Sequence, residues 1–487
     1  MKKILYIIGI LMFTIPFMTS CERDITTLNV DPKHPDTLPS EVFFSTAQYN
    51  LFDRMNGANV NQNISRFFTQ QWTETTYTDE SNYDMVTRQI NTNHWNHMYR
   101  NVLNAIKLGK EKLDVEALNS GDPSYNPVSK NNRWAQLEIM EIYTWANLVD
   151  TYNNIPYTDA LKLLPGGEGS LSPKYDDAKT IYGDLIRRLT EVNSKITAGE
   201  NAYSDYSYNG DMSKWKKLAN SIKLRLGVNL YDVDAALSKT TVESAFSSGV
   251  FTSNDDNFLI NYTSGNFASP LYKNVNVAGS GRKDFVAANT YVDFMNDNND
   301  PRRSAYFTQV DGAYVGGTYG ASSAFDNFSH VADDIIKENG VGDLMDYSEV
   351  SFLLAEAAQR GFSVGGTPEM YYTQAIKASM DYWKVPADEA AAYIAAHPYD
   401  AANWKKSLGE QSWMAMYNRG YEAWTFNRRL DFPVFEVPED SVLDSMPTRM
   451  AYPAPEQSLN QANWQQAVSA LPGGEDVPTT KVFWDVN

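Results

Sequence analysis

Apolar residues recur at helical spacing over two long stretches of the chain, residues 41–231 and 346–429. One clear stripe is formed by Trp215, Leu218, Ala219, Ile222 and Leu226. A spacing of three and four residues places these side chains on one face of a helix, and Asp211 or Ser213 is suited to cap its N-terminus. The pattern predicts a mainly α protein whose helical scaffold occupies these two stretches.

Residues 133–149 are apolar on more than one side, which is typical of a helix buried within the core. The sequence that follows, residues 152–156, reads Tyr-Asn-Asn-Ile-Pro. Asn readily adopts the left-handed conformation of a helix C-cap, and Pro156 cannot continue the helix. An inner helix that ends near Tyr152 is therefore expected.

A helix–turn–helix is predicted between Asp346 and Trp383, with Gly365, Gly366 and Pro368 in the turn. The apolar positions of its two arms are Val350, Leu353, Leu354, Ala357 and Ala358, then Tyr371, Tyr372, Ala375, Ile376 and Met380. Small residues on both arms allow the helices to approach closely, as in tetratricopeptide-type pairs. No fixed repeat period runs through the chain, however, so the repeat consensus itself is absent.

The segment between the two helical stretches, residues 252–340, is rich in Asn, Asp, Ser, Gly and Tyr. This composition predicts long loops and short strands, and long loops on a rigid scaffold commonly carry ligand contacts. The tail from Asp431 is rich in Pro and is expected to be irregular.

The first 21 residues predict export. Lys2 and Lys3 precede an apolar run over residues 4–17, which is too short and too interrupted to span a membrane. Small residues lead into Cys21, the only cysteine of the chain, and this position predicts attachment of a lipid. We expect residues 1–20 to be a lipoprotein signal peptide, residues 21–40 a lipid-anchored tether, and residues 41–487 the folded domain.

Composition narrows the choice of partners. The formal charge is −19, and basic residues occur in pairs, so nucleic acid would be repelled. Aromatic residues make up 13% of the chain, with 30 Tyr and 11 Trp. Rings that also carry a polar group suit the apolar faces of sugars as well as wet protein interfaces.

Motifs for catalysis or metal binding are few. The sequence contains no nucleophile elbow, zinc-protease helix or glycine-rich nucleotide loop. His94 and His97 have the spacing of metal ligands but no third ligand nearby, so a packing role is expected. Residues 297–300 loosely resemble a calcium loop, yet Pro301 and the missing central Gly favour a helix-ending turn. No metal and no cofactor are predicted.

Paired carboxylates keep an enzymatic alternative open. Glycoside hydrolysis needs two carboxyl groups that face each other across a cleft. Two helical pairs among apolar residues could supply them: Glu138 with Glu141, and Glu349 with Glu356. Structural ion pairs explain these residues equally well, and a binding protein is the preferred interpretation.

The segment 71–83 is the candidate ligand site. Its rings alternate with hydrogen-bonding groups, and it looks too polar for the core; the residues singled out are Trp72, Tyr77, Asp79, Asn82 and Tyr83. A sugar ring could stack on the aromatic faces while its hydroxyls bond to the polar groups. An ordinary polar loop with its rings tucked beneath it is an equally good interpretation. Four residues of the middle loops are added as candidates: Tyr272, Arg282, Tyr314 and Tyr319.

An ordered set of segments resembles the SusD/RagB outer-membrane lipoproteins of Bacteroidetes over nearly the whole mature chain. Residues 347–361 resemble the signature helix of that family, residues 422–429 its tryptophan/double-arginine segment, and residues 447–453 its C-terminal stretch. The matching segments upstream are residues 155–157, 218–226 and 299–302. Asn153 departs from the family, which commonly has Gly before its Pro-Tyr.

This resemblance implies a SusD-like fold with four tetratricopeptide-type helix pairs packed against an irregular, ligand-facing part. It implies a SusC-like TonB-dependent porin as partner in the outer membrane, to which the lipoprotein delivers glycans or, in some relatives, peptides. It also implies that Glu356, Trp424, Arg428 and Arg429 hold helices together, while ligand residues follow no fixed motif.

Three functions remain as alternatives: capture of glycans at the cell surface, capture of peptides by the same fold, and a helical glycoside hydrolase. The acidic balance would favour basic peptides in the second case. Glycan capture is the preferred prediction.

Overall fold

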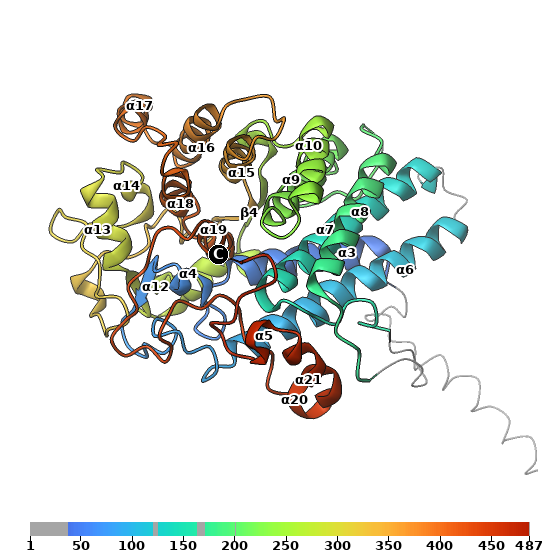
Figure 1. The fold of residues 1–487 in the computed structure, drawn as a ribbon, viewed down its shortest axis with the longest axis horizontal. Helices are drawn as coiled ribbons and strands as arrows, with labels where there is room; N and C mark the ends of the chain where they lie inside the picture. Colours follow the sequence, from blue (N-terminus) through green and yellow to red (C-terminus); the bar gives the residue numbers. More distant parts are fainter. Residues whose placement is uncertain (1–37, 120–124, 163–170, 200, 487) are drawn as a thin grey trace, which may run out of the picture.

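The computed structural model describes residues 38–119, 125–162, 171–199 and 201–486. Cys21, the signal peptide and most of the tether lie outside the described residues. The first helical block contains α3 (Ser40–Asn56), α4 (Ser65–Phe68), α5 (Ile90–His97), the π-helix η1 (Met98–Leu103), α6 (Asn104–Asn119), α7 (Pro127–Tyr152), α8 (Ala178–Lys195), α9 (Met212–Asn229) and α10 (Ala235–Ser248). Figure 1 shows α6 to α10 gathered on one side of the molecule.

The second block contains α15 (Tyr347–Gln359), α16 (Pro368–Tyr382), α17 (Ala387–Ala396), α18 (Trp404–Ala415) and α19 (Gly420–Leu430). It is followed by α20 (Glu456–Leu459), α21 (Gln461–Ser469) and the 3-10 turn η6 (Pro472–Gly474). Together the two blocks confirm the predicted mainly α, SusD-like fold. The helix α10 extends beyond the stretch that periodicity indicated, and α20 and α21 correct the expectation of a wholly irregular tail.

Local sequence signals explain several helix boundaries. The side chain of Asp211 caps α9 by accepting a hydrogen bond from the Ser213 amide. The inner helix α7 ends as predicted at Tyr152, and Asn153 takes a positive φ of 73°. Asp346 caps α15 by accepting from the Glu349 amide, and Gly365 in the turn before α16 has a φ of 77°. The predicted helix–turn–helix is therefore confirmed.

The segment between the blocks carries short elements. These are η3 (Asn254–Asp256), β2 (Phe258–Asn261), η4 (Gly265–Phe267), α11 (Pro270–Asn274), α12 (Val277–Ser280), β3 (Phe285–Ala287), α13 (Asn289–Asp297), α14 (Arg303–Tyr306), η5 (Phe325–Asn327) and β4 (Val341–Met345). The strand β1 (Trp72–Glu74) pairs antiparallel with β3, with Trp72 opposite Ala287. The strand β2 pairs antiparallel with β4, with Phe258 opposite Met345. The two small sheets thus tie this segment to the N-terminal part of the chain and to α15.

Two apolar clusters form the core. The larger cluster runs through both helical blocks. The smaller one joins the middle segment to β1 and α18 through rings that include Trp72, Tyr291 and Trp413. No helix among the described residues is long and apolar enough to cross a membrane.

The C-terminal residues return to the end of α7. The Trp484 indole donates a hydrogen bond to Asp150 at 2.8 Å, and the Phe483 amide donates to the Asn153 side chain at 2.8 Å. The Met450 amide likewise donates to the Thr151 carbonyl at 2.8 Å. Residues 450–484 therefore complete the surroundings of the inner helix.

Candidate functional site

Trp72, the central residue of the predicted site, is completely buried. Its ring lies 4.9 Å from the Arg66 guanidinium and 5.8 Å from the Phe285 ring, and its indole donates to the Tyr417 hydroxyl at 3.0 Å. The expectation that this segment is too polar for the core is wrong at β1. The reason is that the polar groups of this segment bond to distant parts of the chain. The side-chain amide of Gln71, for example, donates to the Met416 carbonyl at 3.2 Å.

Three further predicted residues are also buried and fix the backbone. Asn82 donates to the Gly320 carbonyl at 2.8 Å, and the Tyr319 hydroxyl donates to the Phe67 carbonyl at 2.6 Å. The Tyr83 hydroxyl accepts from Gln70 at 3.1 Å. Asn82, Tyr83 and Tyr319 therefore support the loop from inside, and neither tyrosine presents a free ring face to a ligand.

Tyr77 is the exposed member of the segment, with 74% of its surface accessible. Its backbone takes a left-handed φ of 51°, which turns the chain outward after β1. The Arg88 guanidinium lies 5.8 Å from the ring centre and pairs with Asp79 at 2.9 Å. Tyr77 and Asp79 therefore lie together at the surface, with the Arg88 cation over the ring.

Residues of the middle segment extend this surface. The Thr75 amide donates to the Asp284 carbonyl at 2.9 Å, and the Thr75 hydroxyl donates to the Lys283 carbonyl at 2.6 Å. The predicted Arg282 is about half exposed and pairs with the Asp284 carboxylate. The β1–β3 ladder thus brings Arg282 to the end of the strand that precedes Tyr77.

A second ring belongs to the same surface and was missed by the sequence reasoning. Phe325 stacks on His330 with ring centres 4.4 Å apart, and the Lys283 ammonium lies 5.1 Å from the Phe325 ring. The Ser322 hydroxyl of the same loop donates to the Thr75 carbonyl at 2.5 Å, which holds this loop beside β1. We name the group of Tyr77, Asp79, Arg88, Arg282, Lys283, Phe325 and His330 the Tyr77 surface.

The other two predicted residues are half-buried. Tyr272 lies in α11, and Tyr314 packs beneath Arg303 with 5.7 Å between the guanidinium and the ring centre. Among the described residues, no ring contact or hydrogen bond links either tyrosine to the Tyr77 surface. The structure therefore does not bring all nine predicted ligand residues into one site.

Two carboxyl groups are buried beneath the Tyr77 surface. Glu74 accepts hydrogen bonds from the Ser81 amide at 3.0 Å and the Ser81 hydroxyl at 2.9 Å, while Glu80 pairs with Arg88. Burial and the neighbouring Glu80 charge raise the pKa of Glu74 to about 9. Glu74 therefore holds its proton at neutral pH, which lets the two carboxyl groups lie side by side.

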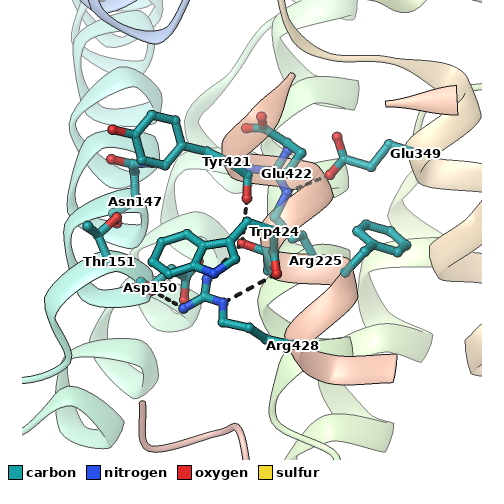
Figure 2. A pocket seen from close by; sticks show the side chains of 11 residues that line it. Asn147, Asp150, Thr151, Arg225, Glu349, Tyr421, Glu422, Trp424 and Arg428 are labelled. Atoms are coloured by element: carbon teal, nitrogen blue, oxygen red, sulfur yellow. Dashed lines mark hydrogen bonds and ion pairs between the residues drawn. The ribbon is translucent and has the colours of Figure 1, made fainter. Parts of the chain in front are cut away.

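The tryptophan/double-arginine segment forms a polar core instead of a binding site. Figure 2 shows Trp424 and Arg428 beside Asp150 and Thr151 of α7. Arg428 donates to the Asp150 carbonyl at 2.7 Å, and the cavity that these residues line holds only about 20 Å³, room for roughly one water molecule. Arg429 pairs with Glu356 at 3.0 Å. These residues hold α7, α15 and α19 together, as the resemblance implied.

The carboxylate pairs considered for hydrolysis are engaged in ion pairs. Glu138 and Glu141 both contact Lys110 and Arg188. Although burial opposes it, the charge of Lys110 and the contacts of Arg188 lower the pKa of Glu138 to about 2.

The second pair is engaged in the same way. Glu349 pairs with Arg225 at 2.6 Å, and Glu356 pairs with Arg360 at 2.9 Å. All four carboxylates are therefore engaged in ion pairs within the scaffold, in agreement with the structural interpretation of these residues.

The two histidines have packing roles. His94 is buried, accepts from Arg54 at 3.0 Å and bonds to Asn147 at 2.8 Å, while His97 contacts the Asn50 carbonyl at 2.9 Å. Residues 297–299 end α13 in a turn, with a φ of 52° at Asn299. Among the described residues, no cluster of three His, Cys, Asp or Glu side chains has the arrangement of a metal site.

Comparison with known proteins places this geometry in a family. The family model SusD-like_2, described as starch-binding and associating with the outer membrane, matches residues 32–453. A solved chitin-binding protein is 27% identical, with a TM-score of 0.78 over 92% of this chain and 99% of that one. A SusD homologue from Bacteroides uniformis is 25% identical, with a TM-score of 0.74 over 91% of this chain and 99% of the other.

A chitin-binding SusD homologue from Flavobacterium johnsoniae shares the fold at 22% identity, with a TM-score of 0.76 over 92% of this chain and 99% of that one. No functionally curated protein is detectably similar to the chain. The family model spans most of the sequence, and the solved relatives share its fold. The chain therefore belongs to the SusD-like family of outer-membrane-associated proteins.

Proposed function

We propose that this protein captures glycans at the cell surface and passes them to a SusC-like TonB-dependent transporter, while Cys21 anchors it to the outer membrane through a lipid. The family description, starch-binding and associating with the outer membrane, supports both the ligand class and the location. The chitin-binding protein of similar structure supports the ligand class independently.

The observation that carries the proposal is the free face of the Tyr77 ring. An aromatic ring that is 74% exposed offers a platform on which the apolar face of a sugar can stack. Arg88 and Asp79 beside it supply a donor and an acceptor for hydroxyl groups. Phe325 and Lys283 repeat this combination of ring and cation on the adjoining loop, so the Tyr77 surface suits a chain of several sugar units.

The proposal is tested by calorimetric titration of residues 22–487 with maltooligosaccharides and chitooligosaccharides. Tyr77→Ala removes one stacking platform, worth about 0.5–1.5 kcal/mol, and should weaken binding by roughly two- to twelvefold. Tyr206→Ala is the matched control, because Tyr206 is also exposed, at 41%, but packs on Phe267 instead of lining the Tyr77 surface. Equal affinities of the two variants would remove the Tyr77 surface from glycan binding.

The peptide alternative and the transporter are tested separately. Displacement of a bound oligosaccharide by a mixed peptide pool would move the proposal toward peptide capture. Co-purification of a TonB-dependent porin with the lipid-anchored protein from native outer membranes would support the transfer step, and its absence under gentle extraction would count against that step.

A further inference from the structure

A large cavity lies outside the Tyr77 surface and shares none of its residues. Its volume is about 600 Å³, within the range of roughly 300–1,000 Å³ that small-molecule sites occupy. The wall is formed by the ends of α14, α16 and α18, by strand β4 and by the loop at residues 332–337. Figure 1 shows α14, α16 and α18 on the side of the molecule away from α6 to α8.

The floor of this cavity has an excess of carboxyl groups. Arg419 is shared by three of them: it lies 2.9 Å from Asp346, 2.9 Å from Glu349 and 3.9 Å from Asp343. Asp346 also accepts the capping hydrogen bond of α15. One guanidinium cannot neutralise three carboxylates, although Arg225 assists at Glu349. The net charge around Asp343 is therefore negative unless one of the carboxyl groups binds a proton.

Asp343 has the most distant pairing of the three: its Oδ2 atom lies 3.9 Å from the Arg419 guanidinium. Its side chain is 11% exposed, and its buried Oδ1 atom has no hydrogen-bond partner among the residues that the structure describes. A buried carboxylate with only a distant cation is costly, and burial raises the pKa of Asp343 well above its usual range. A cation that entered the cavity would take the place of that proton.

Aromatic rings form the side of the cavity next to Asp343. Tyr382, Trp383 and Tyr417 line it, and the Trp383 ring packs edge-on against Tyr306 with centres 4.8 Å apart. Neither the Tyr382 hydroxyl nor the Trp383 indole has a hydrogen-bond partner among the described residues. Aromatic faces beside a carboxylate attract cationic groups, and the free polar groups can bond to the rest of a ligand.

The charged residues at the mouth of the cavity would not repel a cation. Lys337 is paired with Asp334 at 3.2 Å, and the exposed Lys384 is balanced by the exposed Asp333 on the same rim. An anionic ligand, in contrast, would meet Asp343 and Asp346 on the floor. The charge of the cavity therefore favours a positively charged group, and its volume leaves room for the rest of the molecule that carries this group.

We infer that this cavity is a second ligand site, which binds an organic molecule through a primary ammonium group held by Asp343 and the rings of Tyr382 and Trp383. The ammonium belongs either to an amino sugar or to a lysine side chain of a peptide. This inference does not depend on glycan binding at the Tyr77 surface.

The test is titration of residues 22–487 with a glucosamine oligosaccharide and with its N-acetylated counterpart, which has the same sugar rings but no charge. A lysine tetrapeptide and its acetyl-lysine counterpart form the second arm. At least one free amine should bind, and its affinity should fall about tenfold or more in Asp343→Asn, because a charged hydrogen bond is lost. The arm that responds identifies the source of the ammonium.

Two variants control for position and folding. Asp388→Asn removes an exposed carboxylate of α17 that does not line the cavity, and it should leave amine binding within about twofold. Asp343→Asn is isosteric and leaves Arg419 with its closer partners Asp346 and Glu349, so the thermal midpoint should not fall. Trp383→Ala should weaken amine binding as well.

The inference is overturned if neither amine binds, or if amine affinity is the same in the wild type and Asp343→Asn. The glycan proposal is judged by a different result, the effect of Tyr77→Ala on neutral oligosaccharides, so failure of one does not entail failure of the other.

Discussion

Replacing Trp72 by alanine separates a packing role from a ligand-binding role for the tryptophan of β1. The indole is fully buried between Arg66 and Phe285, and its N–H bonds to Tyr417. Truncating a buried tryptophan to alanine costs about 3–5 kcal/mol, which includes the cavity that remains. Loss of the hydrogen bond leaves the Tyr417 hydroxyl without this partner and adds about 1 kcal/mol. Since a domain is commonly stable by only 5–15 kcal/mol, the loss is a large fraction of the total.

Urea unfolding followed by circular dichroism measures this change directly. Trp72→Ala should lower the free energy of unfolding by about 4–6 kcal/mol, whereas Tyr77→Ala should change it by less than about 0.5 kcal/mol because that ring is exposed. Oligosaccharide affinity, measured where both variants are folded, should fall in Tyr77→Ala only. An unchanged urea transition together with lost binding in Trp72→Ala would refute the reasoning and restore Trp72 to the binding site.

Three further predictions concern the scaffold, the loop and the anchor. Glu356→Gln should destabilise the fold by about 3–5 kcal/mol in urea unfolding, because it leaves Arg429 and Arg360 buried without their carboxylate; a loss below 1 kcal/mol would show that the pair is dispensable. The pKa of Glu74 is raised from 4.5 to about 9, so between these values the folded chain keeps a proton that the unfolded chain releases. Stability should therefore fall as the pH rises through this window, by at most about 1.4 kcal/mol per pH unit, and Glu74→Gln should flatten the curve; parallel curves would contradict the assignment. Cys21→Ala should release the protein from the membrane fraction or block its maturation, and normal retention in cell fractionation would exclude the lipid anchor.

Helix positions could be predicted from the sequence because their causes are local. The apolar stripe that begins at Trp215, the Asp211 cap and the glycine turn before α16 all act within one or two helical turns. The pairing of β1 with β3 could not be predicted in this way. These strands are only three residues long, and they meet across more than 200 residues, so their register depends on packing that no local pattern reports.

The residues of the candidate site divide in the same way, into those that a local pattern reveals and those that only the tertiary fold brings together. Tyr77 and Asp79 were found because exposed polar runs with aromatic rings stand out in a sequence. Trp72 was misplaced because the hydrogen bonds that make its polar neighbours suitable for the core come from residues near 416. Phe325 and Lys283 were missed because only the tertiary fold brings their loops to the end of β1.

The contacts of residues 483 and 484 with α7 have a consequence for when the protein can fold. They join positions 330 and 334 residues apart, and Asp150 and Asn153 lack these partners until Trp484 and Phe483 are in place. Because contacts this distant in sequence form only after nearly the whole chain is present, the surroundings of the inner helix are completed last during synthesis. A chain shortened by its last few residues would therefore leave Asp150 and Asn153 without these hydrogen-bond donors, far in sequence from the position of the cut.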